Sequence, residues 1–146
     1  MIYPDLSVLL SLLAPSENSQ EASRLLRRPE SVPLTLSIVH RLQVENSLLR
    51  YLHGSDAQMS EIANDGLLLW RQYIQEGVFE LRSFPLADSF AQAAAWNAES
   101  TYQPPRWHLL IHVALAATEN ALFMSLNPAL RKKASQAGLS LLPNKL

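Results

Sequence analysis

Short apolar segments alternate with helical segments along the chain, and no hairpin signal joins two of the apolar segments. Strands that are connected through helices form βαβ units, and such units build a mostly parallel sheet. Segments with the character of strands cover residues 1–4, 32–36, 78–84, 122–126 and 139–142. We therefore expect an α/β fold of three layers, α/β/α, with a mostly parallel central sheet of four to five strands.

The segments between these strands carry the signals of helices. Asp5 stands where an acidic N-cap is expected, directly before an apolar run that begins at Leu6. Pro29 and Gly138 stand where helices should end. The expected helices cover residues 6–13, 16–28, 38–53, 55–75, 86–100, 107–120 and 128–137.

The composition excludes several classes of protein. A chain of 146 residues with 48% hydrophobic content suffices for one globular domain, which we expect to span residues 1–146. The absence of cysteine excludes a thiol nucleophile, a zinc–thiolate site and a disulfide framework. A net charge of −1 lacks the basic excess of a dedicated nucleic-acid coat. The apolar N-terminus is too short to span a bilayer, so we expect a cytoplasmic protein without a membrane segment.

Polar side chains are expected at one edge of the sheet. In parallel sheets, ligands bind beyond the carboxyl ends of the strands. Asp5 and the residues that follow Leu36 and Leu126 fall at that edge. None of the four glycines forms a phosphate-binding loop, so a small-molecule binder at the same edge is the least favoured function.

Four segments, taken in order, resemble the PIN-domain family, and most closely the toxin component of VapBC toxin–antitoxin modules. The opening MIYPDLSVLL is similar to the family's first strand, whose aspartate and following serine match Asp5 and Ser7. The segment HRLQVENSLL resembles the helix that supplies a second acid, and Gln43 stands at that position.

The third and fourth segments lie in the second half of the chain. RWHLLIHVALA resembles the stretch that supplies a third acid; Leu109 replaces that acid, while His112 and Ala114 match. ALFMSLNPALR resembles the strand end that supplies a fourth acid, and Asn127 stands there after Ser125. The resemblance covers nearly the whole chain and implies a PIN-like fold.

The resemblance implies a metal-dependent ribonuclease in which clustered carboxylates hold Mg²⁺ or Mn²⁺. The family's site positions are Asp5, Ser7, Gln43 and Asn127 in this chain, and only Asp5 is still acidic. A hard cation needs charged oxygen ligands to activate water and to offset charge on the phosphate. We therefore expect no resident cofactor and at most weak metal binding at Asp5, with Mg²⁺ or Mn²⁺ as the cofactor if the chain is active.

Three alternatives would restore a metal site. Glu45 could supply a second carboxylate if the register is shifted by one turn. His108 and His112 share a helix face at a spacing that is common among metal ligands, although a packed interior His112 and an exposed His108 are the more ordinary interpretation. Asp5 could also hold Mg²⁺ through water with the help of Ser7, Gln43 and Asn127.

Other features have both an ordinary and a functional interpretation. The first basic cluster, Arg24, Arg27 and Arg28, and the second, Arg131, Lys132 and Lys133, fit helix C-termini and could also contact RNA phosphates. Trp70, Trp96 and Trp107 are expected to be core or interface anchors, and Trp107 is the best candidate for a partner contact because it follows Pro104 and Pro105.

These observations favour a catalytically impaired PIN-like protein that acts by binding. The expected partners are an antitoxin-like protein, a second copy in a homodimer, or RNA. A helical apolar partner is expected because the first two helices are rich in leucine. The alternative is an active Mg²⁺- or Mn²⁺-dependent endoribonuclease with an atypical ligand set.

Overall fold

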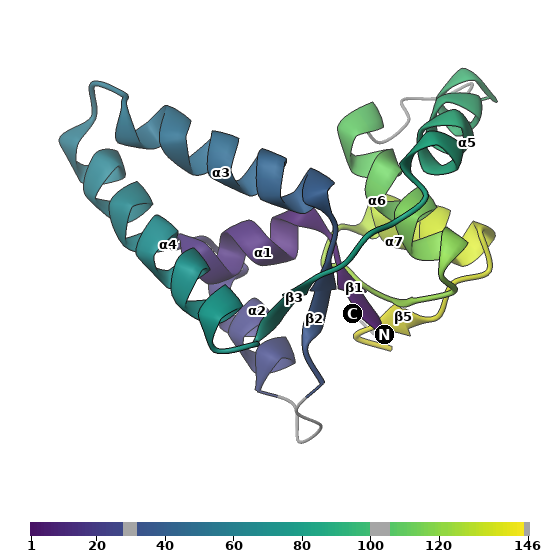
Figure 1. The fold of residues 1–146 in the computed structure, drawn as a ribbon, viewed down its shortest axis with the longest axis horizontal. Helices are drawn as coiled ribbons and strands as arrows, with labels where there is room; N and C mark the ends of the chain where they lie inside the picture. Colours follow the sequence, from purple (N-terminus) through teal and green to yellow (C-terminus); the bar gives the residue numbers. More distant parts are fainter. Residues whose placement is uncertain (28–31, 100–105, 145–146) are drawn as a thin grey trace.

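The computed structural model describes residues 1–27, 32–99 and 106–144. Its strands are β1 (Ile2–Pro4), β2 (Leu34–Leu36), β3 (Phe79–Leu81), β4 (Leu122–Met124) and β5 (Leu141–Leu142). Its helices are α1 (Leu6–Leu13), α2 (Ser19–Leu26), α3 (Ile38–Leu52), α4 (Ala57–Gln75), α5 (Leu86–Glu99), α6 (Trp107–Thr118) and α7 (Pro128–Gln136). The strands form one sheet in the order β3-β2-β1-β4-β5, and every pairing is parallel (Figure 1). The expected α/β class and strand number are confirmed.

The strands are shorter than the sequence predicts, because each ends where its ladder partner ends. β2 pairs with β3 up to Leu36 and Leu81, and the next residue, Ser37, already caps α3. β1 pairs with β4 up to Pro4 and Met124, after which Asp5 caps α1. Apolar residues beyond these points belong to connections. The expected helix stop at Pro29 and the expected loop at residues 101–105 lie outside the described residues.

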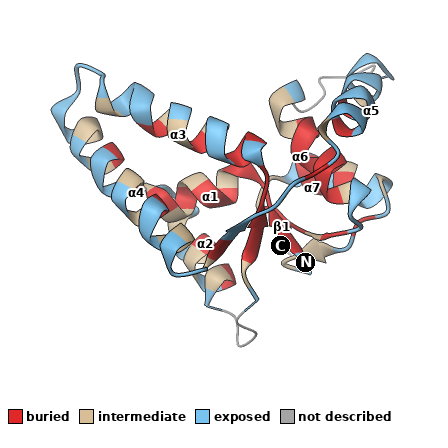
Figure 2. Ribbon diagram, viewed as in Figure 1, coloured by how far each residue is buried: buried red, intermediate tan, exposed pale blue. Residues whose placement is uncertain are grey.

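The sheet separates two hydrophobic layers, because successive side chains of a strand point to opposite faces. Ile2 packs with helices α1 to α4, whereas its neighbour Tyr3 packs with α5, α6 and α7. On the next strand, Met124 and Phe123 divide in the same way. Figure 2 shows buried residues concentrated in β1, β2 and α6, with exposed residues on the outer faces of α3 and α4. This arrangement confirms the three layers.

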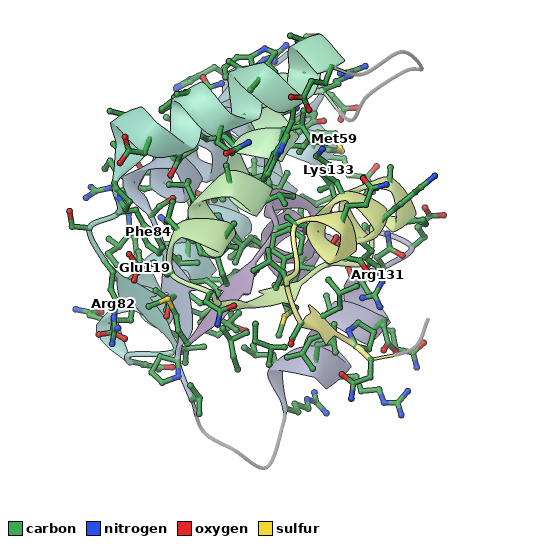
Figure 3. All side chains as sticks on the ribbon, turned by 90° about the vertical axis from the view of Figure 1, so that its right-hand side faces the viewer. Met59, Arg82, Phe84, Glu119, Arg131 and Lys133 are labelled. Atoms are coloured by element: carbon green, nitrogen blue, oxygen red, sulfur yellow. The ribbon has the colours of Figure 1, made fainter. Side chains whose placement is uncertain are left out.

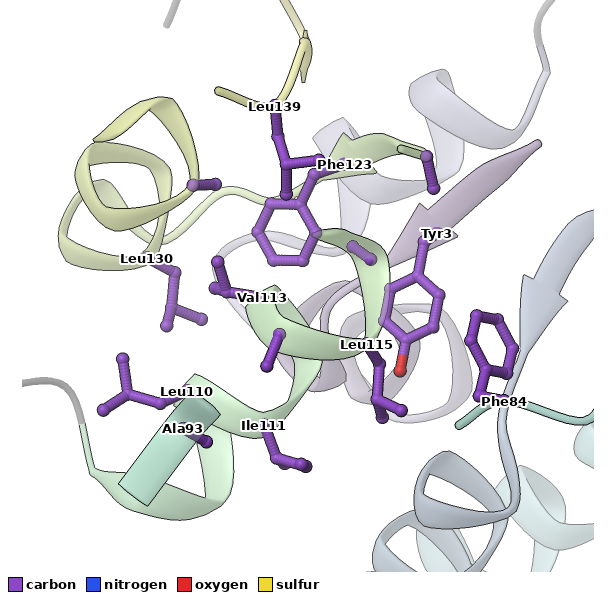
Figure 4. Packing of buried hydrophobic residues seen from close by; sticks show 14 of the residues in the cluster. Tyr3, Phe84, Ala93, Leu110, Ile111, Val113, Leu115, Phe123, Leu130 and Leu139 are labelled. Atoms are coloured by element: carbon purple, nitrogen blue, oxygen red, sulfur yellow. The ribbon is translucent and has the colours of Figure 1, made fainter. Parts of the chain in front are cut away.

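Tyr3 belongs to the hydrophobic layer that lies between the sheet and helices α5, α6 and α7. Its ring meets Phe84 edge-on at 5.4 Å between centroids and stacks on Phe123 at 6.5 Å (Figure 4). Leu110, Val113 and other apolar residues of α6 complete this core. No described helix is long and apolar enough to cross a membrane.

The strand order places β1 in the middle of the sheet. From β1 the chain proceeds to β2 and β3 on one side, and later to β4 and β5 on the other. The carboxyl ends of β1, β2 and β4 therefore meet at the point where the strand order reverses, which is where sheets of this type bind ligands.

Candidate functional site

Polar residues follow directly on the three central strands, after β1 and β2 as the sequence predicts, and after β4 two residues earlier than predicted because this strand ends at Met124. Asp5 comes after β1, Ser37 after β2 and Ser125 after β4. All three side chains are buried. His40 and Gln43 of α3 and His112 of α6 contribute further polar side chains near these residues.

Asp5 is a buried structural junction in which both carboxylate oxygens are used. Oδ1 accepts hydrogen bonds from the Ser7 hydroxyl at 2.7 Å and from the backbone N–H of Val8 at 2.8 Å. Oδ2 accepts a short hydrogen bond from the Ser125 hydroxyl. The predicted N-cap is confirmed, since the Val8 contact closes the first turn of α1. Asp5 thus ties the ends of β1 and β4 to the start of α1.

Burial has an electrostatic cost at Asp5, whose side chain is 0% exposed. Burial raises the pKa of this carboxyl above its ordinary value, because the charged form loses water. The hydrogen bonds that Asp5 accepts, that from Ser125 first, offset part of this rise in pKa.

Asn127 serves as a helix cap. Its Oδ1 accepts from the backbone N–H groups of Ala129 and Leu130, at 3.0 and 3.2 Å, at the start of α7. Its own backbone N–H donates to the Ser125 hydroxyl at 3.1 Å. The side-chain oxygen that a cation would use is therefore engaged with two backbone donors.

Gln43 connects α3 to α6 through both ends of its amide. Nε2 donates to the backbone carbonyl of His108 at 3.2 Å, and Oε1 accepts from Nε2 of His112 at 2.9 Å. Because a carbonyl can only accept, the first contact fixes the orientation of the amide. The second contact then requires a proton on Nε2 of His112.

The hydrogen bonds continue from His112 into the core. Nδ1 of His112 lies 3.1 Å from the Tyr3 hydroxyl, which lies 3.2 Å from the Ser37 hydroxyl. Nδ1 of His40 accepts from the backbone N–H of Ser37 at 3.0 Å, so its Nε2 carries the proton and donates to the carbonyl of Pro4 at 2.8 Å. We call Tyr3, Ser37, His40, Gln43 and His112 the neutral network.

Burial keeps the ionisable members of this network uncharged. It lowers the pKa of His40 to about 3, and the hydrogen bond to the Pro4 carbonyl opposes this only in part. Burial also lowers the pKa of His112 well below its ordinary value, with smaller contributions from His40 and His108. The pKa of the Tyr3 hydroxyl is raised, again by burial.

The alternative ligands, Glu45, His108 and His112, do not join Asp5 in a metal site. Oε1 of Glu45 accepts from Arg41 at 3.0 Å and from the Trp70 indole at 3.3 Å, so this carboxylate faces α4. His112 is buried and hydrogen-bonded, whereas His108 is half-buried with its ring 6.0 Å from that of Trp107.

The described residues do not fit a divalent cation. They contain no group of three or more His, Cys, Asp or Glu side chains that could hold a metal ion. Asp5 is the one acid at the sheet edge among the predicted positions, and its oxygens accept three protein donors. The side-chain oxygens of Gln43 and Asn127 are engaged as well. The structure thus brings the predicted positions into helix caps and bridges.

The second basic cluster differs from the prediction at Arg131. This side chain is buried and donates to the backbone carbonyls of Ser125, Leu142 and Pro143 at 3.0, 3.0 and 2.6 Å. It holds β5 and the following residues against β4 and cannot reach a phosphate, because three carbonyls occupy its guanidinium. Figure 3 shows Arg131 and Lys133 on α7.

The remaining predicted features have separate positions. In the first basic cluster, Arg24 is exposed and pairs with Glu21 at 3.7 Å, and Arg28 lies outside the described residues. Trp70 is buried, whereas Trp96 is half-buried under Lys133, whose ammonium lies 4.6 Å from the ring centroid. Trp107 is 59% exposed, which suits the partner contact predicted for it. Pro104 and Pro105, on which that prediction leaned, are outside the described residues.

Sequence reasoning missed Tyr3, Ser37 and His40 as members of the site. One local signal was available, since Ser37 precedes a helix and His40 stands three residues later, where capping partners occur. Tyr3 carried no such signal, because its partners are 34 and 109 residues away.

A groove of about 560 Å³ lies apart from this network, between α3, α4 and the end of β3. Its lining residues are Arg41, Glu45, Leu49, Leu67, Trp70, Arg71, Ile74, Gln75 and Leu81. Leu49 and Leu81 are 41% and 38% exposed, and Ile38 and Leu42 lie exposed on the same side of α3 as Glu45. The groove thus combines apolar side chains with the charged side chains of Arg41, Glu45 and Arg71.

No protein-family profile and no curated protein matches the sequence. The crystal structure of FitAcB from Neisseria gonorrhoeae matches with a TM-score of 0.65 at 13% identity, over 99% of this chain and 98% of that chain. A structure of FitAB bound to an IR36 DNA fragment matches with a TM-score of 0.65 at 14% identity, over 97% and 94%. VapBC2 from Rickettsia felis, bound to a DNA fragment from their promoter, gives 0.59 at 14% identity, over 97% of each chain. The resemblance is therefore confirmed at the level of structure: over nearly its full length, this chain has the fold of the FitB- and VapC-type PIN-domain toxins of toxin–antitoxin complexes.

Proposed function

We propose that this chain is a PIN-fold protein that does not cleave RNA by the metal-dependent mechanism of its family and acts instead by binding a partner protein. The observation that carries the proposal is the use of Asp5 as a buried junction with three protein donors. A carboxylate has about four lone-pair sites, and three of those of Asp5 are already used within the protein. The remaining site is a poor ligand for a divalent cation without further charged oxygens beside it.

The α3–α4 groove supports a protein partner. The leucines of the first two helices are not available as the sequence suggested, because Leu6, Leu9, Leu13 and Leu25 are buried in the core. The exposed apolar residues that could receive a helix lie instead on α3 and at the end of β3.

We assign to this groove an apolar helical segment of an antitoxin-like partner, with an acidic side chain facing Arg71. Arg71 is exposed at the border of the groove, whereas Arg41 is already paired with Glu45 at 3.0 Å. The matched FitAB and VapBC2 structures were both solved as assemblies bound to DNA, and not as single chains. That likeness makes a protein of a neighbouring gene the natural candidate.

The catalytic half of the proposal is tested by RNA cleavage. Purified protein is incubated with structured and single-stranded RNA and MnCl₂, beside Asp5→Asn, which keeps the shape of the side chain and removes its charge. We expect no cleavage above a no-protein control for either form. Cleavage by the native chain that disappears in Asp5→Asn would establish the alternative, an active endoribonuclease with an atypical ligand set.

The binding half is tested by titration calorimetry with the purified product of the adjacent gene. We expect Leu49→Glu to weaken binding at least about tenfold, the usual scale for loss of a central apolar contact. Phe90→Glu on α5, which also replaces an exposed apolar side chain, should leave the affinity unchanged. If light scattering shows that the native chain is a dimer and Leu49→Glu a monomer, the groove is an interface between copies and the assignment of a partner is wrong.

A further inference from the structure

Gln43 occupies a position at which a donor and an acceptor are both required. Its Nε2 meets the carbonyl of His108 at 3.2 Å, and its Oε1 meets Nε2 of His112 at 2.9 Å. These two α6 groups are separated by one helical turn, so a single amide spans them. A carboxylate at the same place can accept from His112 and cannot donate to the His108 carbonyl.

The roles of the ring nitrogens of His40 and His112 in the neutral network follow from this amide and from one backbone group. The amide makes His112 a donor at Nε2 and an acceptor at Nδ1, so the Tyr3 hydroxyl donates to it. The backbone N–H of Ser37 makes His40 an acceptor at Nδ1 and a donor to the Pro4 carbonyl at Nε2. The rings of His40 and His112 lie 4.3 Å apart between centroids. Two imidazolium rings at that distance would repel each other, so the two rings cannot both be charged. The acceptor role of Nδ1 in each ring makes both of them neutral.

The network also joins distant parts of the fold. Gln43 and His40 come from α3, His112 from α6, Tyr3 from β1, and Ser37 from the end of β2. Buried side-chain N and O atoms without a hydrogen-bond partner are absent from the described residues. A fully satisfied polar network of this kind rigidifies its surroundings, whereas a partly satisfied one is costly.

We infer that Gln43 is a cation-independent clasp: its amide holds α3 against α6 and sets the hydrogen bonds of the neutral network, so that this edge of the sheet is closed without any metal ion. The edge that the fold family uses for a cation is thus built for a different purpose in this chain. This inference does not depend on whether the chain binds a partner protein.

A glutamate at position 43 should therefore open the clasp, although glutamate is the residue that the PIN resemblance implies there. Its carboxylate would face the His108 carbonyl with no donor between them. It would also place a second negative charge at the edge that holds the buried Asp5. Both effects destabilise the folded state, and two carboxylates alone are a poor set of ligands for Mn²⁺.

The experiment compares the melting temperatures of the native chain, Gln43→Glu and Gln92→Glu, each with and without millimolar MnCl₂. Gln92 is exposed on α5, so it controls for the added charge. We expect Gln43→Glu to lower the melting temperature by roughly 5 °C, Gln92→Glu to change it little, and Mn²⁺ to affect none of the three. Equal melting temperatures for the two variants would overturn the clasp. So would a saturable rise of the native melting temperature with Mn²⁺ that Asp5→Asn abolishes.

A second measurement needs no variant. Long-range ¹H–¹⁵N correlation spectra of the native chain at neutral pH report which ring nitrogen carries the proton. We expect His40 and His112 both to be neutral and protonated at Nε2. A proton on Nδ1 of His112, or an imidazolium signal from it, would contradict the assigned direction of the Gln43 amide.

Discussion

At the scale of the residue, the structure depends on groups that are buried without charge. His40 and His112 are both 0% exposed, and the donors and acceptors around them match the neutral rings. A proton added to His40 would convert its acceptor nitrogen into a donor that faces the backbone N–H of Ser37. A proton added to His112 would force the Tyr3 hydroxyl to change from donor to acceptor. The free energy of unfolding should therefore respond to pH through these two side chains.

The sign of the response follows from the pKa of His40, which falls from 6.5 to about 3 on folding. Between these values the unfolded chain binds a proton that the folded chain excludes, so stability is lost as the pH falls below about 6.5. We expect the free energy of unfolding to drop by about 2 kcal/mol for His40 between pH 6.5 and about pH 5. Urea unfolding across this range measures the slope.

His53→Gln is the matched control for this prediction, since His53 is exposed at the end of α3. It should leave the slope as it is, whereas His40→Gln should flatten it. Asp5 acts in the opposite direction, because its raised pKa means that folding favours its protonated form and its burial costs stability at neutral pH. Equal slopes for the native chain and His40→Gln from pH 7 to pH 5 would show that the His40 ring is not held neutral.

Local roles of residues were visible in the sequence, and long-range ones were not. Asp5 could be recognised as a cap because its partner Val8 is three residues away. The contact of Gln43 with His112 spans 69 residues, and no periodicity or spacing encodes it. The resemblance predicted Gln43 as a site position, and the structure shows that its amide bridges α3 and α6. The resemblance gave no information on which α6 atoms the amide would bind.

At the scale of the element, α1 and α4 approach closely at a glycine. A Cβ added at Gly66 would lie 2.7 Å from the backbone oxygen of Leu13 and 3.2 Å from a methyl group of Leu48. The first contact is with backbone at the end of α1, which cannot rotate away. The sequence offers Gly66 only as an isolated glycine inside a helical pattern, and such a glycine often has a packing reason.

Gly66→Ala tests this close approach because two effects compete. Alanine gains about 1 kcal/mol in helix propensity over glycine. Forcing α1 and α4 apart costs about 1–3 kcal/mol, as overpacking does elsewhere. We expect a net loss of stability in chemical denaturation, and Asn64→Ala, at an exposed position of the same helix, should be neutral or slightly stabilising. A Gly66→Ala chain that is more stable than the native one would show that the helices have room to separate.

Element boundaries were predicted well for helices and less well for strands. α3 and α7 begin at Ile38 and Pro128, where the sequence predicted, since Ser37 and Asn127 mark their starts. The segment at residues 78–84 was expected to be extended throughout, and β3 covers only Phe79–Leu81. Strand ends depend on the length of the neighbouring strand, which a single segment does not reveal.

At the scale of the whole molecule, the side chain of Leu109 contacts the hydrophobic layers on both sides of the sheet. Leu109 is partly buried and stands where the resemblance expects an acid. A hydrocarbon there adds to the packing between the layers, whereas a carboxylate would lose that contact and repel Asp5. The four positions of the resemblance are thus occupied by two helix caps, Asp5 and Asn127, an amide bridge at Gln43 and an apolar contact at Leu109.

Restoring all the acids together distinguishes a retained scaffold from an unrelated one. The variant Gln43→Glu, Leu109→Asp, Asn127→Asp should remain folded and be less stable than the native chain without metal, because four carboxylates repel one another at one edge. Mn²⁺ should bind this variant, which calorimetry detects, and raise its melting temperature, since a ligand that binds only the folded state stabilises it. The native chain, with one carboxylate already bound by three donors, should show neither effect. Leu68→Asp, at an exposed leucine of α4, controls for the added charge. If the triple variant is folded and indifferent to Mn²⁺, the four positions do not converge on one point and the register of the PIN resemblance is wrong.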